Sequence, residues 1–319
     1  MLIVNWNTRD LLRRCLKSLF ENPPKESMEV VVVDNASGDG SAEMVRAEFP
    51  QVNLIAPGAN TGYAKGNNLA MAAANGEWLL TLNPDTEALA LTLQTAIDKL
   101  NANPTYGVLG AKQIGLEGET QCSVRGFPSF RGVFGDITGL GKLFKNSSLD
   151  SYRRTGFDYN KEQPAPQPMG TFLLFRRSAL EQVGELGNGR KGVPETPATE
   201  VSIGQGAPSP PFTHSPTLPL QPFDEHFPIF FNEVDLLYRL NKAGWPCLYS
   251  PDVEIKHLGG GSTKRVRKSM IWESHKSLMR FFEKHYRTSA TAPLLFLLRG
   301  LVYLAALVRA RGYDAGFKA

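Results

Sequence analysis

The sequence predicts an α/β protein built on a doubly wound sheet, mixed but mostly parallel, followed by a helical C-terminal tail. Two observations predict the sheet. Residues 1–110 repeat a strand, turn and helix cadence, and the strand segments 30–33 and 78–82 are apolar without period-two alternation. Continuous apolar strands are typical of parallel sheets with helices on both faces. A basic and apolar stretch after residue 256 predicts the tail.

The individual elements follow from apolar spacing and turn residues. Residues 118–161 are rich in loops and show no regular pattern. Strands are expected at 2–4, 30–33, 52–55, 78–82, near Val108, and at 169–175, 247–250 and 253–257. Helices are expected at 8–21, 41–49, 62–75, 89–101, 178–183, 233–243 and 269–285.

Composition excludes several protein classes. With 319 residues, 42% of them hydrophobic, the chain can bury a sizeable core. Its three cysteines form no CxxC or Cys/His cluster, which excludes a zinc site or disulfide framework and favours a reducing compartment. The apolar run at residues 1–4 is too short for a signal peptide. We therefore expect a cytoplasmic protein.

Two segments depart from the α/β cadence. Residues 185–222 contain 8 Pro and 5 Gly, a composition that cannot propagate a helix or a central strand, so we expect a mobile insertion. Residues 294–308 are apolar except for Arg299 and Gly300, yet span only about 22 Å, less than a bilayer core of about 30 Å. Residues 256–311 hold twelve Lys/Arg against two Asp/Glu.

This basic, apolar tail predicts a helix lying in the membrane interface. The alternative is a helix packed on the core or on a partner. We expect one main domain over 1–287 and the amphipathic tail over 288–319.

The carboxyl ends of the expected strands carry polar residues, and ligands of doubly wound sheets bind at such ends. Asp34 can accept a hydrogen bond from a pyrimidine ring, and Trp6 offers a face for stacking. A helix cap is the alternative role for Asp34. The amides and glycines of residues 60–68 suit an anionic diphosphate at a helix start.

The segment 83–86, Asn-Pro-Asp-Thr, provides hard oxygen ligands for Mg²⁺ or Mn²⁺, which must also use substrate phosphates. His257, at the end of an expected strand, can add a third ligand, although a structural role is common for such a histidine.

Glu233 and Asp235 begin a helix behind Phe230 and Phe231, where a desolvated carboxylate can take a proton. Because they are two positions apart on a helix, only one can face a substrate.

Nine segments carry a family resemblance. They are VNWN (4–7), VDNASGDGS (33–41), NTGYAKGNN (60–68), LNPDT (82–86), SVRGFP (123–128), MGTFLLFRRSAL (169–180), FDEHFPIFFNEVDLLYRL (223–240), AGW (243–245) and HLGGGST (257–263). In this order they resemble glycosyltransferase family 2, in particular its rhamnosyltransferase-like branch, from residue 2 to about 286. The resemblance implies the GT-A fold.

The resemblance also implies roles for individual residues. Asp34 would read the nucleobase, Asp85 would bind the metal that bridges the donor diphosphate, and His257 would assist there. The Glu233 position would carry the base that deprotonates the acceptor hydroxyl, so that a single displacement inverts the anomeric carbon. Donor-binding residues would be Asn5, Trp6, Asn7, Asp34, Asn35, Asn60, Gly62, Asn67, Asn68 and Asn83, and Gly170 and Thr171 would lie on the acceptor side.

The chain departs from the family pattern in four places. Asn83 replaces one of two usual acids in the metal motif, and Asn232-Glu233 replaces the usual Glu-Asp pair, which makes Asp235 a rival base. Residues 185–222 interrupt a normally short link. The first strand is a few residues shorter than usual, so the native start could lie upstream.

These features predict an inverting glycosyltransferase that moves a deoxysugar such as rhamnose from a nucleoside diphosphate, with Mn²⁺ or Mg²⁺. The acceptor would be a lipid-linked glycan or polysaccharide in cell-surface glycan synthesis, at the inner, cytoplasmic face of the membrane. Alternatives are a nucleotidyltransferase and a non-catalytic nucleotide-sugar-binding paralogue. The basic run 264–268 favours lipid or solvent over nucleic acid, so no nucleic-acid partner is expected.

Overall fold

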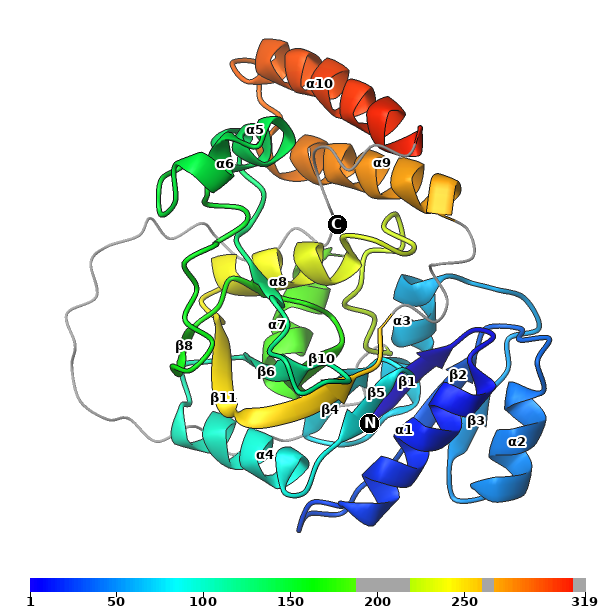
Figure 1. Cartoon of the computed structure of the whole chain (residues 1–319). Helices are drawn as coiled ribbons and strands as arrows, with labels where there is room; N and C mark the ends of the chain where they lie inside the picture. Colours follow the sequence, from blue (N-terminus) through cyan, green and yellow to red (C-terminus); the bar gives the residue numbers. More distant parts are fainter. Residues whose placement is uncertain (188–218, 260–266, 312–319) are drawn as a thin grey trace.

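A computed structural model describes residues 1–187, 219–259 and 267–311. Its centre is a mixed sheet in the order β3-β2-β1-β4-β10-β6-β11-β5, with β8 paired to β11 (Figure 1). The strands are β1 (Leu2–Asn5), β2 (Val31–Asp34), β3 (Asn53–Ile55), β4 (Trp78–Leu82), β5 (Thr86–Ala88), β6 (Val108–Ile114), β8 (Gln163–Pro164), β10 (Phe172–Arg176) and β11 (Cys247–His257). All but β5, β8 and β10 run in one direction, so the sheet is mixed and mostly parallel, as predicted.

Helices cover both faces of this sheet. They are α1 (Arg9–Glu21), α2 (Ser41–Glu48) and α4 (Thr92–Ala102) on one face, and α3 (Tyr63–Ala73), α7 (Arg177–Gly187) and α8 (Asn232–Lys242) on the other. Successive strand residues supply both cores: Ile3 packs with Leu12 and Leu16, whereas Leu2 and Val4 pack with the opposite helices. This arrangement explains why the strands are apolar at every position.

Helix α3 lies unusually close to the sheet because Gly66 faces β1. A Cβ atom at Gly66 would lie 2.8 Å from Val4 Cγ1, which is closer than real side chains approach. Gly66 therefore serves helix packing.

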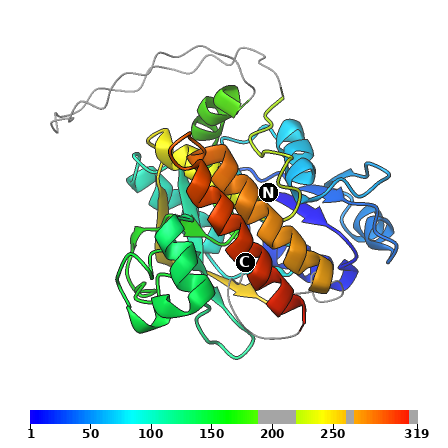
Figure 2. The same cartoon turned by 90° about the horizontal axis from the view of Figure 1, so that it is seen from above.

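A third layer lies beyond α8 (Figures 1 and 2). It contains α9 (Arg267–Tyr286), α10 (Ala292–Ala310), α5 (Phe130–Thr138) and α6 (Leu140–Leu143). A small separate sheet of β7 (Val124–Arg125) and β9 (Gln167–Pro168) contacts β11 of the main sheet. One apolar cluster joins Val133 of α5, Phe281 of α9 and Leu298 of α10 to Phe231 and Val234 of α8. The tail helix is thus packed on the main body.

The structure corrects four expectations. Residues 247–257 form one strand with a register shift between Ser250 and Glu254, because the chain bends without leaving β6. Residues 118–161 contain α5 and α6, whose three glycines obscure helical periodicity. The insertion expected at 185–222 is narrower, since α7 runs through residue 187 and Leu220 packs on the core. Residues 188–218 of this insertion lie outside the described ranges. Most of the basic run 264–268 also lies outside them.

The fourth correction concerns the length of α10. The helix has 19 residues and a mean hydropathy of 1.7, so its length and composition would allow it to cross a membrane. The expectation that it is too short is therefore wrong. Its buried residues Leu295, Leu298 and Val302 instead pack with α9 and α5.

Candidate active site

Three neighbouring parallel strands end in polar side chains at one edge of the sheet. β1 ends at Asn5, β2 ends at Asp34, and Asn83 directly follows β4. The Asn5 carboxamide donates to Asp34 Oδ1 over 2.9 Å. The structure thus brings together the polar groups expected at the carboxyl ends of these strands.

The turn after β2 is held by hydrogen bonds. Asp34 Oδ2 accepts from the Ser37 backbone N–H at 3.0 Å, and Ser37 Oγ accepts from the Asn5 side chain and the Asn7 backbone. Asn7 and Ala36 have φ values of 54° and 57°. Such left-handed residues cost roughly 1–3 kcal/mol and persist where the surroundings fix them, often at ligand sites.

Asp34 does not cap a helix, so that alternative is wrong. Helix α2 begins only at Ser41, and Asp39 accepts from the Ser41 backbone N–H. Asp34 is buried, and Trp6 beside it is 37% exposed. The carboxylate lies beneath the edge and the indole lies at the surface.

Asn35 organises the loop before α3. Its Oδ1 accepts from the Thr61 backbone and hydroxyl, and its Nδ2 donates to the Gly62 carbonyl over 3.1 Å. Asn60 Oδ1 accepts from the Gly62 backbone N–H. Gly62 has φ 83°, and a Cβ there would lie 3.0 Å from the Pro228 carbonyl oxygen, so a side chain would be excluded.

The start of α3 does not offer its backbone to a diphosphate, contrary to our interpretation of residues 60–68. The N–H groups of Tyr63 and Ala64 both donate to the Pro228 carbonyl, at 2.7 and 3.3 Å. Asn68 exchanges hydrogen bonds with the Phe223 backbone. Asn67 donates to the Tyr63 carbonyl, and its buried Oδ1 has no hydrogen-bond partner within the described ranges.

Asp85 and His257, 172 positions apart, meet at this edge. His257 Nε2 lies 3.6 Å from Asp85 Oδ2, and the Asp85 carbonyl accepts from the Leu258 backbone. The other ring nitrogen, Nδ1, lies 2.8 Å from Gln121 Oε1. Asp85 Oδ1 is buried and has no hydrogen-bond partner in the described part of the chain.

A divalent cation fits these residues. An unpartnered carboxylate oxygen beside an imidazole nitrogen is a donor set that Mn²⁺ accepts, and a hydrogen bond on the second ring nitrogen is usual for metal-binding histidines. Among the described residues no group of three or more His, Cys, Asp or Glu side chains is arranged around one point. Further ligands would therefore have to come from the substrate.

Glu233 lies in the first turn of α8, against Gly170. A Cβ at Gly170 would lie 3.3 Å from Glu233 Cγ. Within the described ranges, no other residue donates a hydrogen bond to the Glu233 carboxylate, and burial raises its pKa to about 7, partly offset by its own backbone N–H. Phe231, the residue before α8, has a φ of 66°, which is a strained left-handed conformation at the point where the chain enters the helix that carries Glu233. Such a carboxylate can accept a proton near neutral pH.

Asp235 has the opposite environment. It is fully buried, Oδ2 accepts from Arg239 at 2.8 Å, and Oδ1 lies 2.7 Å from both His285 Nε2 and Lys284 Nζ. Despite the desolvation, the His285 hydrogen bond and the charges of Arg239 and Lys284 hold the pKa of Asp235 well below its usual range. Oδ2 is thus paired within α8, whereas Oδ1 joins α8 to α9.

Tyr63 connects the strand edge to Glu233, a link that the sequence did not reveal. Its hydroxyl donates to Asn83 Oδ1 over 3.1 Å and lies 3.5 Å from the Gly170 carbonyl. Burial raises its pKa, and the Glu233 charge adds to the shift. Thr171, also buried, accepts from the Asn83 backbone through its carbonyl. The predicted donor and acceptor residues are therefore contiguous.

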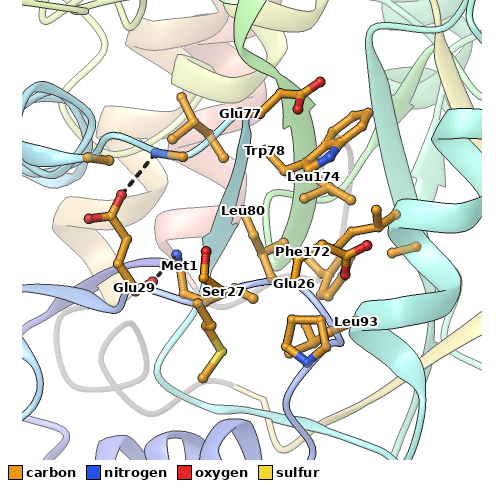
Figure 3. A pocket seen from close by; sticks show the side chains of 17 residues that line it. Met1, Glu26, Ser27, Glu29, Glu77, Trp78, Leu80, Leu93, Phe172 and Leu174 are labelled. Carbon is orange, nitrogen blue, oxygen red and sulfur yellow. Dashed lines mark hydrogen bonds between the residues drawn. The ribbon is translucent and has the colours of Figure 1, made fainter.

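A cavity of about 310 Å³ lies elsewhere, near the amino-terminal ends of β1 and β4 (Figure 3). Trp78, Leu80, Leu93 and Phe172 line it together with Glu26. None of the predicted site residues contributes to its lining, so the catalytic assignment does not depend on it.

Comparison with protein families shows to which family the chain belongs. The family model described as glycosyl transferase family 2 matches residues 1–184, more than half of the chain. The chain belongs to glycosyl transferase family 2. It is therefore a glycosyltransferase, as the motifs predicted.

Two family members from Mycobacterium tuberculosis, strains CDC 1551 / Oshkosh and ATCC 25618 / H37Rv, are similar along most of their length. Each is named N-acetylglucosaminyl-diphospho-decaprenol L-rhamnosyltransferase and is 29% identical to this glycosyltransferase over 306 residues. The match covers 92% of this chain and 86% of each relative. It extends well beyond the region matched by the family model.

Solved structures confirm the GT-A fold. The mannosyltransferase PcManGT from Pyrobaculum calidifontis, solved with GDP-Man and Mn²⁺, has a TM-score of 0.52 at 19% identity, covering 98% of this chain and 75% of its own. GalNAc-T7, solved with UDP, GalNAc and Mn²⁺, has a TM-score of 0.54 at 13% identity, covering 95% and 54%. At these identities the likeness concerns the fold alone.

Two residues that contact the candidate site of this glycosyltransferase escaped the sequence analysis. Tyr63 lies inside the segment NTGYAKGNN, and its position between two strand ends was the only available signal. Gln121 follows a loop that gave no pattern, and nothing local connects it with His257, 136 positions away. Both act through contacts between distant segments.

Proposed function

We propose that this enzyme transfers a deoxysugar, best matched by L-rhamnose, from a nucleoside diphosphate to a lipid-linked saccharide, with inversion at the anomeric carbon. The observation that carries the proposal is the Glu233 carboxylate. It is desolvated, has no hydrogen-bond donor from another described residue, and lies across Gly170 from the polar strand edge. The names of the curated relatives support the sugar and the acceptor.

On the donor side, buried Asp34 would accept from the nucleobase and Trp6 would stack on it. Asn5, Asn7 and Asn35 hold the turns around this pocket in place. Asp85 and His257 would hold a divalent cation, Mn²⁺ or Mg²⁺, which supplies charge neutralisation to the departing diphosphate. The Mn²⁺ in the two similar structures is consistent with this assignment.

On the acceptor side, Glu233 would take the proton of the attacking hydroxyl. As that O–H bond breaks, the hydroxyl oxygen bonds to the anomeric carbon, and the bond from this carbon to the diphosphate oxygen breaks with its electron pair leaving on the nucleotide. A single displacement of this kind inverts the configuration. A pKa near 7 suits the task, because the base is largely ionised at cellular pH and still basic.

Asp235 is better suited to position Glu233 than to replace it. Both of its oxygens are occupied by cations of α8 and α9, and its depressed pKa makes it a weak base. It fixes the helix on which Glu233 stands.

We further propose that the enzyme works at the cytoplasmic surface of the membrane, held by α10. Phe296, Leu297 and Leu304 are exposed on this helix while the opposite side packs on α9. A helix with one apolar side unpartnered in the described structure fits a position in the plane of the interface.

No observation favours the two alternatives. A nucleotidyltransferase would need a basic activating loop near the N-terminus, where residues 5–10 offer only Arg9. Arg9 pairs with Asp10, and its backbone N–H donates to Asp39. A non-catalytic paralogue gives no reason for a desolvated carboxylate at the acceptor side.

A screen of nucleoside-diphosphate sugars with Mn²⁺ or Mg²⁺ tests the proposal, using a short-chain saccharide diphospho-lipid as acceptor. We expect transfer from a deoxysugar donor, with proton NMR of the product showing the inverted anomer. Retention of configuration would refute the single displacement. If Asp85→Asn kept full activity with every donor, the cation assignment would be wrong.

A further inference from the structure

The segment formed by α5 and α6, residues 130–145, exposes large apolar side chains next to α10. Leu143 is 76% exposed, and Phe134 and Phe144 are also exposed. The two views place this segment beside α9 and α10 (Figures 1 and 2), and Val133 of α5 packs in one cluster with Leu298 of α10. Two elements distant in sequence therefore form adjacent parts of one surface.

The exposure of these side chains is built into the segment. A Cβ at Gly135 would lie 2.2 Å from the Leu149 carbonyl oxygen, and one at Gly141 would lie 2.7 Å from the same atom. The chain therefore passes tightly beneath both helices and leaves no interior space for larger side chains. Arg153 donates to buried Asp136 over 2.6 Å, which fixes α5 from below.

The charges around the apolar side chains have one sign. The exposed charged residues of this segment are Arg131, Lys142 and Lys145, all basic, whereas Asp136 is buried and paired. From residue 284 to residue 311 the sequence has no Asp or Glu. Apolar tips surrounded by Lys and Arg match the surface of an anionic bilayer, to which such cations are attracted.

We propose that residues 130–145 form a second membrane-binding element, which docks together with α10 on an anionic lipid surface. A protein partner is less well matched, because protein interfaces are depleted in lysine at their centre. Two contacts hold a molecule in one orientation, whereas a single helix would leave it free to roll about the helix axis.

The same apolar cluster extends from this surface to the catalytic helix. It contains Val133, Leu298, Phe281, Phe231 and Val234, and the last two flank Asn232 and Glu233. Docking through both elements would therefore set the height and direction of Glu233 relative to the membrane. This step rests on the proposed function, since it assumes a lipid-linked acceptor.

Sedimentation with anionic phosphatidylglycerol vesicles and with neutral phosphatidylcholine vesicles tests the proposal on the full chain. The variant Leu143→Ser/Phe144→Ser should bind the anionic vesicles about tenfold more weakly, because two apolar insertions are lost. Lys142→Gln/Lys145→Gln should weaken binding to anionic vesicles only. The matched control is Leu91→Ser/Leu116→Ser, since both leucines are 73% exposed and lie outside this surface.

Equal vesicle binding by wild type and Leu143→Ser/Phe144→Ser would overturn the inference. So would light scattering that shows a wild-type dimer which this variant dissociates, because a second copy would then cover the surface. Transfer to a soluble short-chain acceptor separates the two proposals. Failure of that reaction in the wild type counts against the proposed function, whereas normal transfer without vesicle binding counts against the membrane surface alone.

Discussion

The carboxyl ends of β1, β2 and β4 and the helix pair α8–α9 give their polar side chains two different environments. At the edge, Asn5, Asp34 and Asn35 are held in place by hydrogen bonds to one another and to the loops. At the start of α8, Glu233 follows the buried Phe231, lies against Gly170 and is partly buried, and no other described residue contacts its carboxylate by a hydrogen bond. A prearranged polar edge suits a charged donor, and a partly desolvated carboxylate without a hydrogen-bond donor suits a base.

The difference also appears within a single helix turn. Asp235 is buried with two cationic partners, Arg239 and Lys284, a hydrogen bond to His285 and a lowered pKa, while Glu233 has a raised pKa and none of these partners. The predictions below test whether side chains that are paired with neighbours have a structural role, and whether side chains without such partners take part in the reaction.

The largest expected effect is on turnover in Glu233→Gln. The amide cannot take the hydroxyl proton, so kcat should fall about 10³-fold while donor KM changes little. Steady-state kinetics measure this, with Glu181→Gln, an exposed glutamate on α7, as the control. A fall of less than tenfold, or a larger fall in Asp235→Asn at equal folded fraction, would move the base to Asp235.

Asp235→Asn should act mainly on stability. Removing the charge leaves Arg239, His285 and Lys284 without their shared partner, which should cost about 3 kcal/mol of unfolding free energy at pH 7. Because the folded pKa is depressed, this contribution is present above the unfolded pKa near 4 and is lost as pH falls further. Urea titrations should show it, and a change as small as in exposed Asp98→Asn would contradict the assignment.

The raised pKa of Glu233 gives the opposite sign. Its pKa of about 7 in the folded protein exceeds the ordinary glutamate value of 4.5, so stability is lost as pH rises from 4.5 to about 7. The free energy of unfolding of Glu233→Gln should therefore exceed that of wild type by roughly 2 kcal/mol at pH 8. At pH 4 the two proteins should be about equally stable. The wild-type kcat/KM should rise with pH to a plateau above about 7. A flat profile together with equal stabilities would show an ordinary, solvated carboxylate.

At the polar edge, Asp34→Asn should weaken nucleoside-diphosphate binding about tenfold, because a charged acceptor is lost from a buried site. Calorimetric titration with the nucleotide measures this directly. Unchanged affinity at full helical content would mean that Asp34 only supports the turn through Asn5 and Ser37.

An effect as small as that of Asp34→Asn, on a different quantity, is expected for Gln121→Leu. Its Oε1 orients the His257 ring, so its loss should weaken Mn²⁺ activation about tenfold with little change in stability. The apparent activation constant for Mn²⁺ reports this, with exposed Gln51→Leu as the control. An unaltered constant would leave His257 outside the cation site.

Much of the fold follows from the sequence alone. The apolar runs of β2 and β4 and the helical spacing of α1 and α8 are local patterns, so their positions were predicted within a few residues. The gathering of Asn5, Asp34 and Asn83 at one edge also followed, since parallel strands place their carboxyl ends together. The family motifs added the order of these parts.

Other features depend on contacts between distant segments, and only the tertiary structure decided them. Pro228 takes the N–H groups at the start of α3, Gln121 holds His257, and α9 supplies His285 and Lys284 to Asp235. No local pattern encodes these pairings, because each depends on how separate elements pack. The residue types at the candidate site can therefore be inferred from local patterns in the sequence, whereas packing sets which of their side-chain atoms are bound to neighbours and which have no partner among the described residues.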